Sequence, residues 1–409
     1  MKRFSRRQFI EWSAWGTGAV LASPWLGAQS NVLAPPELTI RGGTVIDPAS
    51  GLHGRRDVMV RDGRIQQVGL AEAGSMGGHV IDATGLLVVP GLVDLHAHVG
   101  APEATLGLPV DTLTAETGVT TCVSAGDVGA PDWAAFQRDV VDQLNTRVLA
   151  FLHISNRGLL GFPEPEMLDL ADIAVDRAAE TVAAHADVLL GIKVREGSAI
   201  VGENGLEPLR RAIAAAERAG GGARVMCHIG DAPGALSDLL DLLRPGDILT
   251  HCFSGLGNNI VQAGKLLPAA REAQTRGVIF DVGHGGGSFD FAVAEAALDQ
   301  GLRPHTISSD LHRASIDTPG NPRLPWVMSK FLALGFSLDE VVAMVTTRPA
   351  GVIDRIQGLG TLAPGAPADV TLLELVEEPT VFVDTTTKRR AGDRYLRPAG
   401  VIRAGRVMV

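Results

Sequence analysis

The middle of the chain alternates short apolar runs with stretches of helical periodicity. Apolar runs of strand length that alternate with helices are typical of a parallel sheet. Eight such runs fall between residues 89 and 355, which predicts a closed (β/α)8 barrel. An open doubly wound sheet is the alternative, but it gives no reason for the repeat to stop at eight. The runs are Leu92–Val99, Val119–Ser124, Val148–Ile154, Val188–Val194, Arg224–Ile229, Ile248–Cys252, Val278–Val282 and Thr306–Asp310.

Between the apolar runs lie the segments that we predict to be helical. The clearest of them are Trp133–Leu144, Ala171–Ala186, Leu206–Ala219 and Phe291–Leu302. A helix between successive strands is the connection that a parallel barrel requires.

Both flanks of this region, residues 36–88 and 356–409, have a different pattern. They contain short β-like runs without helical periodicity, and Asp62-Gly63 is a strong hairpin signal between two of them. We therefore predict an α/β protein in which a TIM barrel carries a small β-sandwich domain built from both chain ends.

Residues 1–30 have the pattern of an export signal. Arg6-Arg7 follows Ser5 and precedes a mildly apolar stretch, Trp12–Leu26, as in twin-arginine signals. The prediction is transport by the twin-arginine machinery to the periplasm or beyond. A membrane-anchoring or amphipathic helix is the alternative, although the apolar stretch is short for a span of about 20 residues. No later segment is predicted to cross a membrane.

Composition narrows the class of partner. The 409 residues carry a formal charge of −10, and nucleic-acid binding needs clustered Lys and Arg. The short run 388–390 is better explained as a solvated loop. A small-molecule substrate fits this composition, while the oligomeric state stays open, a homo-oligomer included.

The chain has three cysteines, Cys122, Cys227 and Cys252. So sparse a set does not predict a disulfide framework. Cys227 and Cys252 each adjoin a histidine at the end of a predicted strand, and neighbours on a strand point to opposite faces. If those histidines face the barrel interior, the cysteines pack against the helices.

Chemistry in such a barrel belongs to the C-terminal ends of the strands. Five of the eight runs end on a side chain that can bind a metal. His-x-His alone is weak evidence, but one suitable residue at each of these ends, in this order, is not expected by accident. The candidate ligands are His96, His98, Lys193, His228, His251 and Asp310.

Lys193 is the unusual member, because an amine buried in a barrel is costly without compensation. Carbamylation by carbon dioxide would convert it into an anionic ligand that bridges two metals, and pairing with an inward carboxylate is the other interpretation. Nitrogen and carboxylate ligands without thiolate favour two divalent zinc ions, with manganese or iron less suitable.

The order of these residues resembles that of the amidohydrolase superfamily of binuclear metalloenzymes. Further motifs resemble its amidohydrolase/deacetylase branch, often labelled dihydroorotase-like, and the resemblance covers residues 36–409. The motifs are Val89–His98, Ile248–Phe253, Gly277–Gly285, Ser329–Gly335 and Gly358–Asp369.

The resemblance implies a division of labour among the ligands. His96, His98 and Asp310 would hold the more buried metal, and His228 and His251 the outer one. Carbamylated Lys193 and a hydroxide would bridge the two metals. Asp310 would take the proton of the hydroxide and pass it to the leaving group, while the outer metal would polarise the carbonyl group of the substrate.

The predicted reaction is hydrolysis of an amide or ester bond, with deacetylation of a small N-acyl or O-acyl compound as the first choice. Cyclic amide hydrolysis of the dihydroorotase or hydantoinase type, dipeptide hydrolysis and lactone hydrolysis use the same metal core. A non-catalytic, exported binding barrel is the alternative from another class.

Four residues are candidates for contact with the substrate. His284 lies in a glycine-rich loop after the seventh run. Arg195 shares a strand face with Lys193 and could clamp a carboxylate, with a structural ion pair as the equal alternative. His153 lies on the third run, and His312 follows Asp310. Relatives in this branch commonly have an Asp-Ile-Tyr-like sequence where this chain has Asp310-Leu311-His312, a difference that concerns the substrate rather than the metals.

Overall fold

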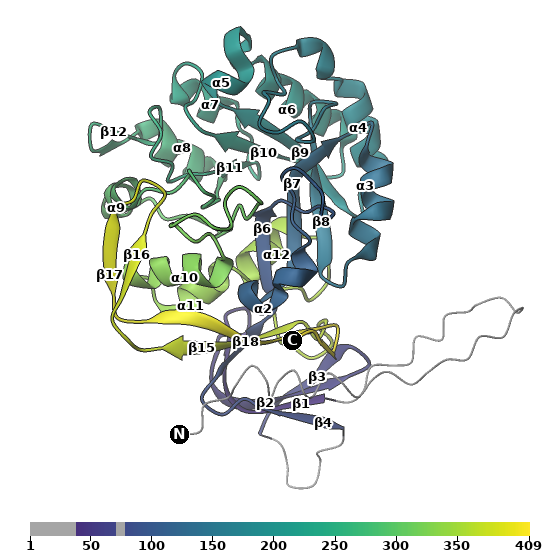
Figure 1. The fold of residues 1–409 in the computed structure, drawn as a ribbon, viewed down its shortest axis with the longest axis vertical. Helices are drawn as coiled ribbons and strands as arrows, with labels where there is room; N and C mark the ends of the chain where they lie inside the picture. The colour runs from purple at the N-terminus through teal and green to yellow at the C-terminus, as the bar shows by residue number, and fades with distance from the viewer. Residues whose placement is uncertain (1–37, 71–77) are drawn as a thin grey trace, which may run out of the picture.

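The computed structural model describes residues 38–70 and 78–409. The export signal predicted for residues 1–30 lies outside the described residues and stays a prediction. Within the described chain, a parallel barrel occupies the middle of the sequence and a β-rich unit gathers both ends (Figure 1).

Seven parallel strands form the regular part of the barrel wall, and each pairs with the next one along the chain. They correspond to the first seven predicted runs. The strands are β6 (Leu92–Ala97), β7 (Val119–Gly129), β8 (Arg147–His153), β9 (Leu189–Glu196), β10 (Arg224–Ile229), β11 (Ile248–Thr250) and β14 (Ile279–Phe280).

The eighth predicted run closes the barrel without becoming a regular strand. It makes one parallel bridge to Asp281, just after β14, and another through Leu311 to Ala97 at the end of β6. The backbone departs from strand geometry at Asp310, whose φ is +45°, a region that non-glycine residues seldom adopt. The TIM-barrel prediction is confirmed, with one irregular member.

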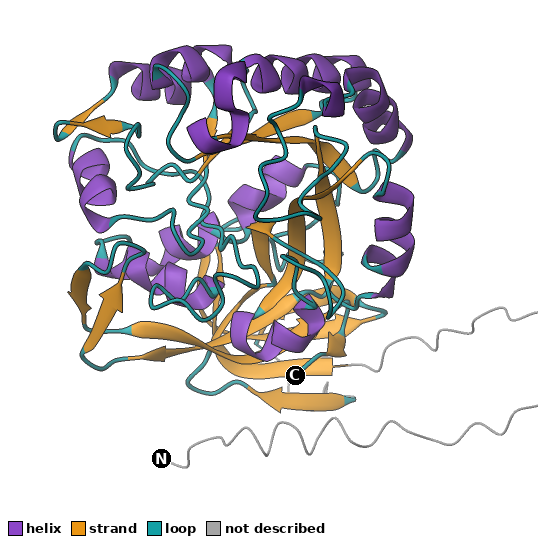
Figure 2. Cartoon of the chain, turned by 45° about the horizontal axis from the view of Figure 1, so that its top comes forward, coloured by secondary structure: helices purple, strands orange, loops and turns teal. Residues whose placement is uncertain are grey.

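Helices cover the outside of the barrel (Figure 2). Three of the four clearest predicted helices are α4 (Val175–Ala184), α6 (Glu207–Ala219) and α9 (Phe291–Asp299). The first predicted helix is interrupted: α3 (Trp133–Asp139) ends early and a 3-10 turn, η2 (Val141–Gln143), follows it. The other helical segments are η1 (Val110–Leu113), α2 (Thr114–Thr117), η3 (Leu170–Asp172), α5 (Ser198–Val201), η4 (Gly202–Asn204), α7 (Leu236–Leu242), α8 (Pro268–Arg276), α10 (Leu324–Ala333), α11 (Leu338–Met344) and α12 (Thr347–Ile353).

Two hydrophobic layers hold the barrel together. The outer layer lies between strands and helices and contains the three cysteines, all of them free. The predicted packing of Cys227 and Cys252 is confirmed, and Cys122 is buried as well. The inner layer fills the floor of the barrel, where Val352 and Ile353 of α12 join apolar side chains from the strands. Those strand residues are Val93, Leu95, Val123, Ala125, Leu149, Phe151, Leu190, Met226 and Ile248.

The two chain ends build one β-rich unit, as predicted. Its strands form a single mixed sheet of eight, with the C-terminal β15 paired to the N-terminal β5. The predicted hairpin at Asp62-Gly63 joins β2 to β3, and both turn residues have positive φ. The strands are β1 (Leu38–Asp47), β2 (Leu52–Arg61), β3 (Arg64–Gly69), β4 (His79–Asp82), β5 (Leu87–Pro90), β15 (Val370–Val376), β18 (Tyr395–Arg403) and β19 (Arg406–Val407).

Two small hairpins extend from this framework. β12 (Val261–Gln262) pairs with β13 (Lys265–Leu266), and β16 (Thr380–Val383) pairs with β17 (Arg389–Gly392). The second hairpin leaves the β-rich unit between β15 and β18 and reaches the barrel beside α9 and α10 (Figure 1). No helix among the described residues is long and apolar enough to cross a membrane.

Candidate metal centre

The six predicted ligands lie at or just past the C-terminal ends of the barrel strands. Five of them are buried and His228 is partly buried. His96 is in β6 and His98 follows its end, Lys193 is in β9, His228 is in β10, His251 follows β11, and Asp310 lies in the closing segment.

A β-bulge sets the direction of the first two histidines. The pairing of β6 with β7 shifts register between Asp94 and Ala97. Within the shifted stretch, Leu95 faces the packed floor, whereas the next residue, His96, and then His98 face the site. A bulge inserts one residue and re-aims the following side chains, so the His-x-His pair enters the site together.

The side chains of His96, His98 and Asp310 converge on one point. Both Nε2 atoms lie 3.3 Å from Oδ1 of Asp310, and one ligand atom from each of the three residues lies within 4.8 Å of the others. The amine of Lys193 is 3.2 Å from Nε2 of His96. Nitrogen and carboxylate atoms clustered in this way fit a divalent metal.

Contacts on the far side of three rings determine which nitrogen faces the centre. Nδ1 of His98 lies 2.8 Å from Oδ1 of Asp127, and Nδ1 of His251 lies 2.6 Å from the carbonyl oxygen of Gly283. Both partners are acceptors, so each Nδ1 carries the proton and each Nε2 offers a lone pair.

His96 follows the same rule through a hydroxyl group. Its Nδ1 lies 2.8 Å from Oγ1 of Thr250, and that hydroxyl donates to Oδ2 of Asp281 at 2.8 Å. Because the hydroxyl proton is committed to Asp281, its oxygen accepts from His96. The Nε2 atom of His96 is again the one left for a metal.

The other half of the site contains an unpartnered nitrogen. Nε2 of His251 is buried and has no hydrogen-bond partner among the described residues. The ring of His251 lies 4.3 Å from that of His228 and 5.0 Å from that of His96, measured between centroids. Buried polar atoms almost always have a hydrogen-bond partner. The lack of one at this nitrogen is consistent with a role as a metal ligand.

Electrostatics favours the ligand forms of His251 and Asp310 and the neutral amine of Lys193, but not the ligand form of His98. Burial lowers the pKa of His251 to about 4 and that of Lys193 to about 8. Burial opposes ionisation of Asp310, yet the neighbouring His96 and His98 hold its pKa well below the usual range. Burial likewise opposes protonation of His98, but the carboxylates of Asp127 and Asp310 raise its pKa to about 9; a metal would compete with that proton.

A small pocket opens above the ligands. Apolar and polar side chains share its wall, which is lined by His98, Leu106, Leu159, Phe162, Lys193, Arg195, His228, Asp310 and His312. Of the four predicted substrate contacts, the structure thus brings Arg195 and His312 to the pocket.

Arg195 is held by a residue that the sequence did not single out. Oε2 of Glu166 accepts from Nη1 of Arg195 at 3.0 Å, and Oε1 lies 3.3 Å from Nε2 of His153. His153 is buried and supports Arg195 through Glu166 instead of lining the pocket. Glu166 lies in an irregular loop after β8, so no periodic signal marks it.

His312 lines the pocket, whereas His284 does not. Nδ1 of His312 accepts from the backbone of Ala314 at 3.2 Å, and its ring lies 5.8 Å from that of His98 at the pocket wall. His284 is buried, and its two ring nitrogens contact Lys330 and the carbonyl oxygen of Gly285. In this structure His284 has no ring nitrogen free for a substrate.

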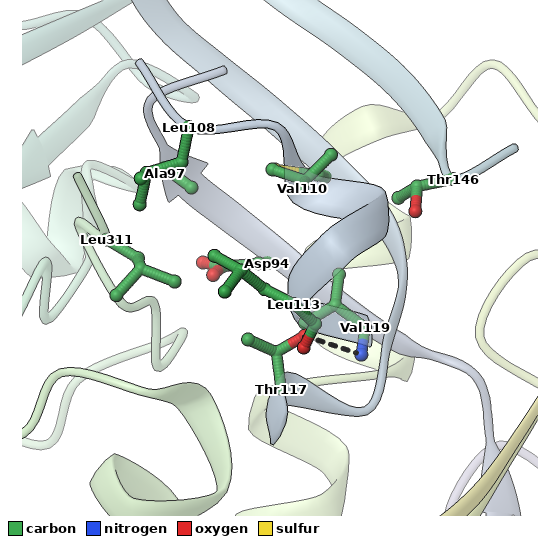
Figure 3. Close-up of a pocket in the computed structure, with 10 residues that line it drawn as sticks. Asp94, Ala97, Leu108, Val110, Leu113, Thr117, Val119, Thr146 and Leu311 are labelled. Atoms are coloured by element: carbon green, nitrogen blue, oxygen red, sulfur yellow. Dashed lines mark hydrogen bonds between the residues drawn. The ribbon is translucent and has the colours of Figure 1, made fainter. Parts of the chain in front are cut away.

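A second cavity lies beside β6, and most of the side chains that line it are apolar (Figure 3). The carboxylate of Asp94 at its wall accepts from the backbone of Ser309 at 3.0 Å, which supports the segment next to Asp310. This cavity holds no cluster that could hydrolyse a substrate. Its lining residues are Asp94, Ala97, Leu108, Val110, Leu113, Thr117, Val119, Cys122, Thr146 and Leu311.

Comparison with known proteins decides the family. The model of the amidohydrolase family matches residues 87–408. The chain belongs to the amidohydrolase family. It is similar to a protein from Brucella anthropi named deacetylase, with 35% identity over 347 residues that cover 84% of this chain and 85% of that protein.

Two solved structures are similar over most of this amidohydrolase. A structure described as a dihydroorotase has a TM-score of 0.83 and 31% identity, and covers 91% of this chain and 97% of its own. One described as an adenine deaminase has a TM-score of 0.82 and 30% identity, and covers 90% and 98%. The family and these relatives support a hydrolase, and they leave its substrate open.

Proposed function

We propose that this amidohydrolase is a binuclear metal-dependent deacetylase that acts on a small N-acyl or O-acyl compound bearing a carboxylate. One observation carries the metal-dependent part. Ligand atoms of His96, His98 and Asp310 converge in one buried site beside Lys193, and Nε2 of the neighbouring His251 has no hydrogen-bond partner among the described residues.

The residues fit two divalent metals, and zinc suits this ligand set best. His96, His98 and Asp310 would hold one ion, and His228 and His251 the other. Bound metals would supply an activated water at neutral pH and polarise the carbonyl group of the substrate.

Lys193 is suited to bridge the two ions after carbamylation. Its pKa of about 8 leaves a fraction of neutral amine at neutral pH, and this form attacks carbon dioxide. A new N–C bond forms, one proton leaves the nitrogen, and the product is an anionic carbamate. Its nearest polar contact is Nε2 of His96, so the new oxygens would lie beside the first ligand set.

Asp310 is the proposed general base. Its carboxylate is held ionised by His96 and His98 and lines the pocket. It would accept the proton of the attacking water and return it to the leaving nitrogen or oxygen.

Arg195 is the proposed anchor for the substrate carboxylate. Glu166 accepts a hydrogen bond from Nη1 of Arg195, and the guanidinium donates no other hydrogen bond to the described residues. The rest of the group therefore remains available at the pocket wall, where Phe162 lies 6.0 Å from it. Charge-assisted pairing with a carboxylate fixes orientation as well as affinity.

The deacetylase assignment is preferred because the Brucella protein of that name matches most of this chain. Cyclic amide hydrolysis is the second candidate, favoured by the structure described as a dihydroorotase. We further propose that the protein is exported to the periplasm by the twin-arginine route, on the basis of Arg6-Arg7 in the sequence.

The test is a hydrolysis screen with zinc-loaded protein. The panel contains N-acetyl amino acids, O-acetyl hydroxy acids, the methyl esters of both, a cyclic amide, a dipeptide and a lactone. We expect the acyclic acetyl acids to react fastest. Faster turnover of the cyclic amide would replace deacetylation by the second candidate, and absence of turnover throughout would contradict the proposal.

The variant Arg195→Met tests the anchor. Loss of a charge-assisted hydrogen bond should lower kcat/KM for the acetyl acids about 10- to 100-fold, and leave the methyl esters nearly unchanged. Arg157→Met is the matched control, because Arg157 pairs with exposed Glu164 and does not line the pocket. Equal loss for acids and esters would refute a carboxylate contact.

A further inference from the structure

Lys330 is a buried lysine outside the ligand set. Its side chain on α10 is fully buried, and its amine meets three acceptors. They are Nε2 of His284 at 2.6 Å, the carbonyl oxygen of Gly320 at 2.6 Å and that of Val383 at 2.8 Å. An ammonium has three N–H donors, so all of them are used.

These three acceptors come from three separate parts of the chain. His284 lies in the loop after β14, Gly320 in the stretch between Asp310 and α10, and Val383 ends β16. A buried amine requires compensation of this kind. The position of Lys330 therefore joins two loops at the barrel mouth to the hairpin of β16 and β17.

His284 transmits this restraint to a turn beside the ligands. Its Nδ1 donates to the carbonyl oxygen of Gly285 at 2.8 Å, so its Nε2 is the acceptor for Lys330. The ring also stacks on Phe289, with centroids 4.9 Å apart. Contacts at both ring nitrogens and the stacking on Phe289 therefore fix the orientation of the His284 ring.

The turn itself touches two proposed ligands. The carbonyl oxygen of Gly283 accepts from Nδ1 of His251 at 2.6 Å, and a Cβ atom on Gly285 would overlap the carboxylate of Asp310. Both glycines have positive φ, +48° and +54°, which glycine adopts without strain. The backbone N–H groups of the turn donate to Ser308 and Ser309 of the closing segment, and the side chain of His284 adds a further restraint.

The hairpin is fastened to the same loop by further contacts. The hydroxyl of Thr385 accepts from the backbone of Phe289 at 3.1 Å, and the carboxylate of Asp384 accepts from the backbone of Phe291 at 3.0 Å. The C-terminal part of the chain thereby supports the barrel mouth at two points, one through Lys330 and one through the hairpin turn.

We propose that Lys330 is a positioning residue that, through His284, fixes the Gly283–Gly285 turn and hence the ring of His251. The inference rests on the proposed metal centre and adds a residue and a C-terminal hairpin to its support. Lys330 itself touches no ligand. Its effect is on the geometry of the outer metal site.

The decisive measurement is zinc affinity by chelator competition, with thermal unfolding as the measure of folding. Lys330→Met should weaken the outer zinc about 10- to 100-fold, as loss of a supporting contact does, and should weaken the inner zinc less. His284→Leu should have the same effect, and His284→Gln, which keeps an acceptor for Lys330, should recover part of it. The double variant Lys330→Met/His284→Leu should lose no more than the worse single variant.

Ser329→Ala is the control on the same helix. Its buried hydroxyl donates to Pro325 and accepts from the backbone of Leu396, so its loss destabilises α10 without touching the turn. It should lower Tm and leave zinc affinity unchanged. If Lys330→Met does not fold, the His284→Leu and His284→Gln pair carries the test.

The outcomes separate the two proposals. Wild-type protein that binds no zinc refutes the metal centre, and the inference with it. Wild-type protein that binds two zinc ions, together with variants that bind both as tightly, refutes only the role of Lys330. Additive losses in the double variant would show that Lys330 does not act through His284.

Discussion

Strand β9 carries two buried ionisable residues that point to opposite faces and have very different surroundings. Lys193 faces the interior, where His96 and Asp310 lie around it. Glu196 faces the helices, and neither of its carboxyl oxygens has a close hydrogen-bond partner among the described residues. Burial dominates both groups and favours the neutral form of each: it lowers the pKa of Lys193 to about 8 and raises that of Glu196 to about 8.

The difference shows what makes a buried ionisable group functional. On the inner face, Lys193 shares one site with metal-competent groups from four other strand ends, three of which, His96, His98 and Asp310, converge on one point. On the outer face, Glu196 lies near Cys227, and burial favours its protonated form. Burial alone therefore does not identify a site, but convergence of partners does.

The largest expected effect comes from removing the inner group. Lys193→Ala should reduce turnover at least about 1000-fold, because the metals supply several kcal/mol of transition-state stabilisation and each 1.36 kcal/mol is tenfold. Zinc content should fall from two ions per chain, and short-chain acids with zinc should restore part of the activity. Full activity in Lys193→Ala would contradict the bridging role. Lys193 would then be, like Glu196, a buried ionisable residue without a function in catalysis.

A smaller effect should follow from a partner on the inner face. Asp127 holds Nδ1 of His98, so Asp127→Asn should weaken zinc binding about 10- to 100-fold while the fold stays intact. Isothermal titration with zinc measures it, and circular dichroism checks the fold. Unchanged affinity would show that ring orientation is fixed by packing alone.

The smallest effect should come from the outer group and should appear only in stability. The pKa of Glu196 is raised from 4.5 to about 8 in the folded chain, so between these pH values the folded state holds a proton that the unfolded state has lost. The free energy of unfolding therefore falls as pH rises through this window, by at most about 1.4 kcal/mol per pH unit. Glu196→Gln should lack this decline.

Urea unfolding at pH 5, 6, 7 and 8 measures the difference. The variant and the wild type should be similar near pH 5 and diverge toward pH 8, with zinc affinity the same throughout. If the free energy of unfolding of the two proteins changed with pH in parallel, Glu196 would be ionised in the folded protein. Lys193 and Glu196 would then differ only in their neighbouring groups.

The sequence by itself determined the barrel, the β-rich unit of both chain ends and the positions of the six candidate ligands. These follow from local periodicity and from one topological fact, that the ends of parallel strands meet at one face. The i and i+2 spacing of His96 and His98 and the free, core-facing cysteines follow from the same local rules.

Only the tertiary structure decided which side chains outside the strands serve the site. Glu166 reaches Arg195 from an irregular loop, and His284, predicted as a substrate contact, is committed to Lys330 and Gly285. The sequence of the closing segment likewise contains no signal that predicts the irregular backbone at Asp310. Loop contacts depend on packing between distant parts of the chain, and periodicity, which is a property of neighbours, contains no information about them.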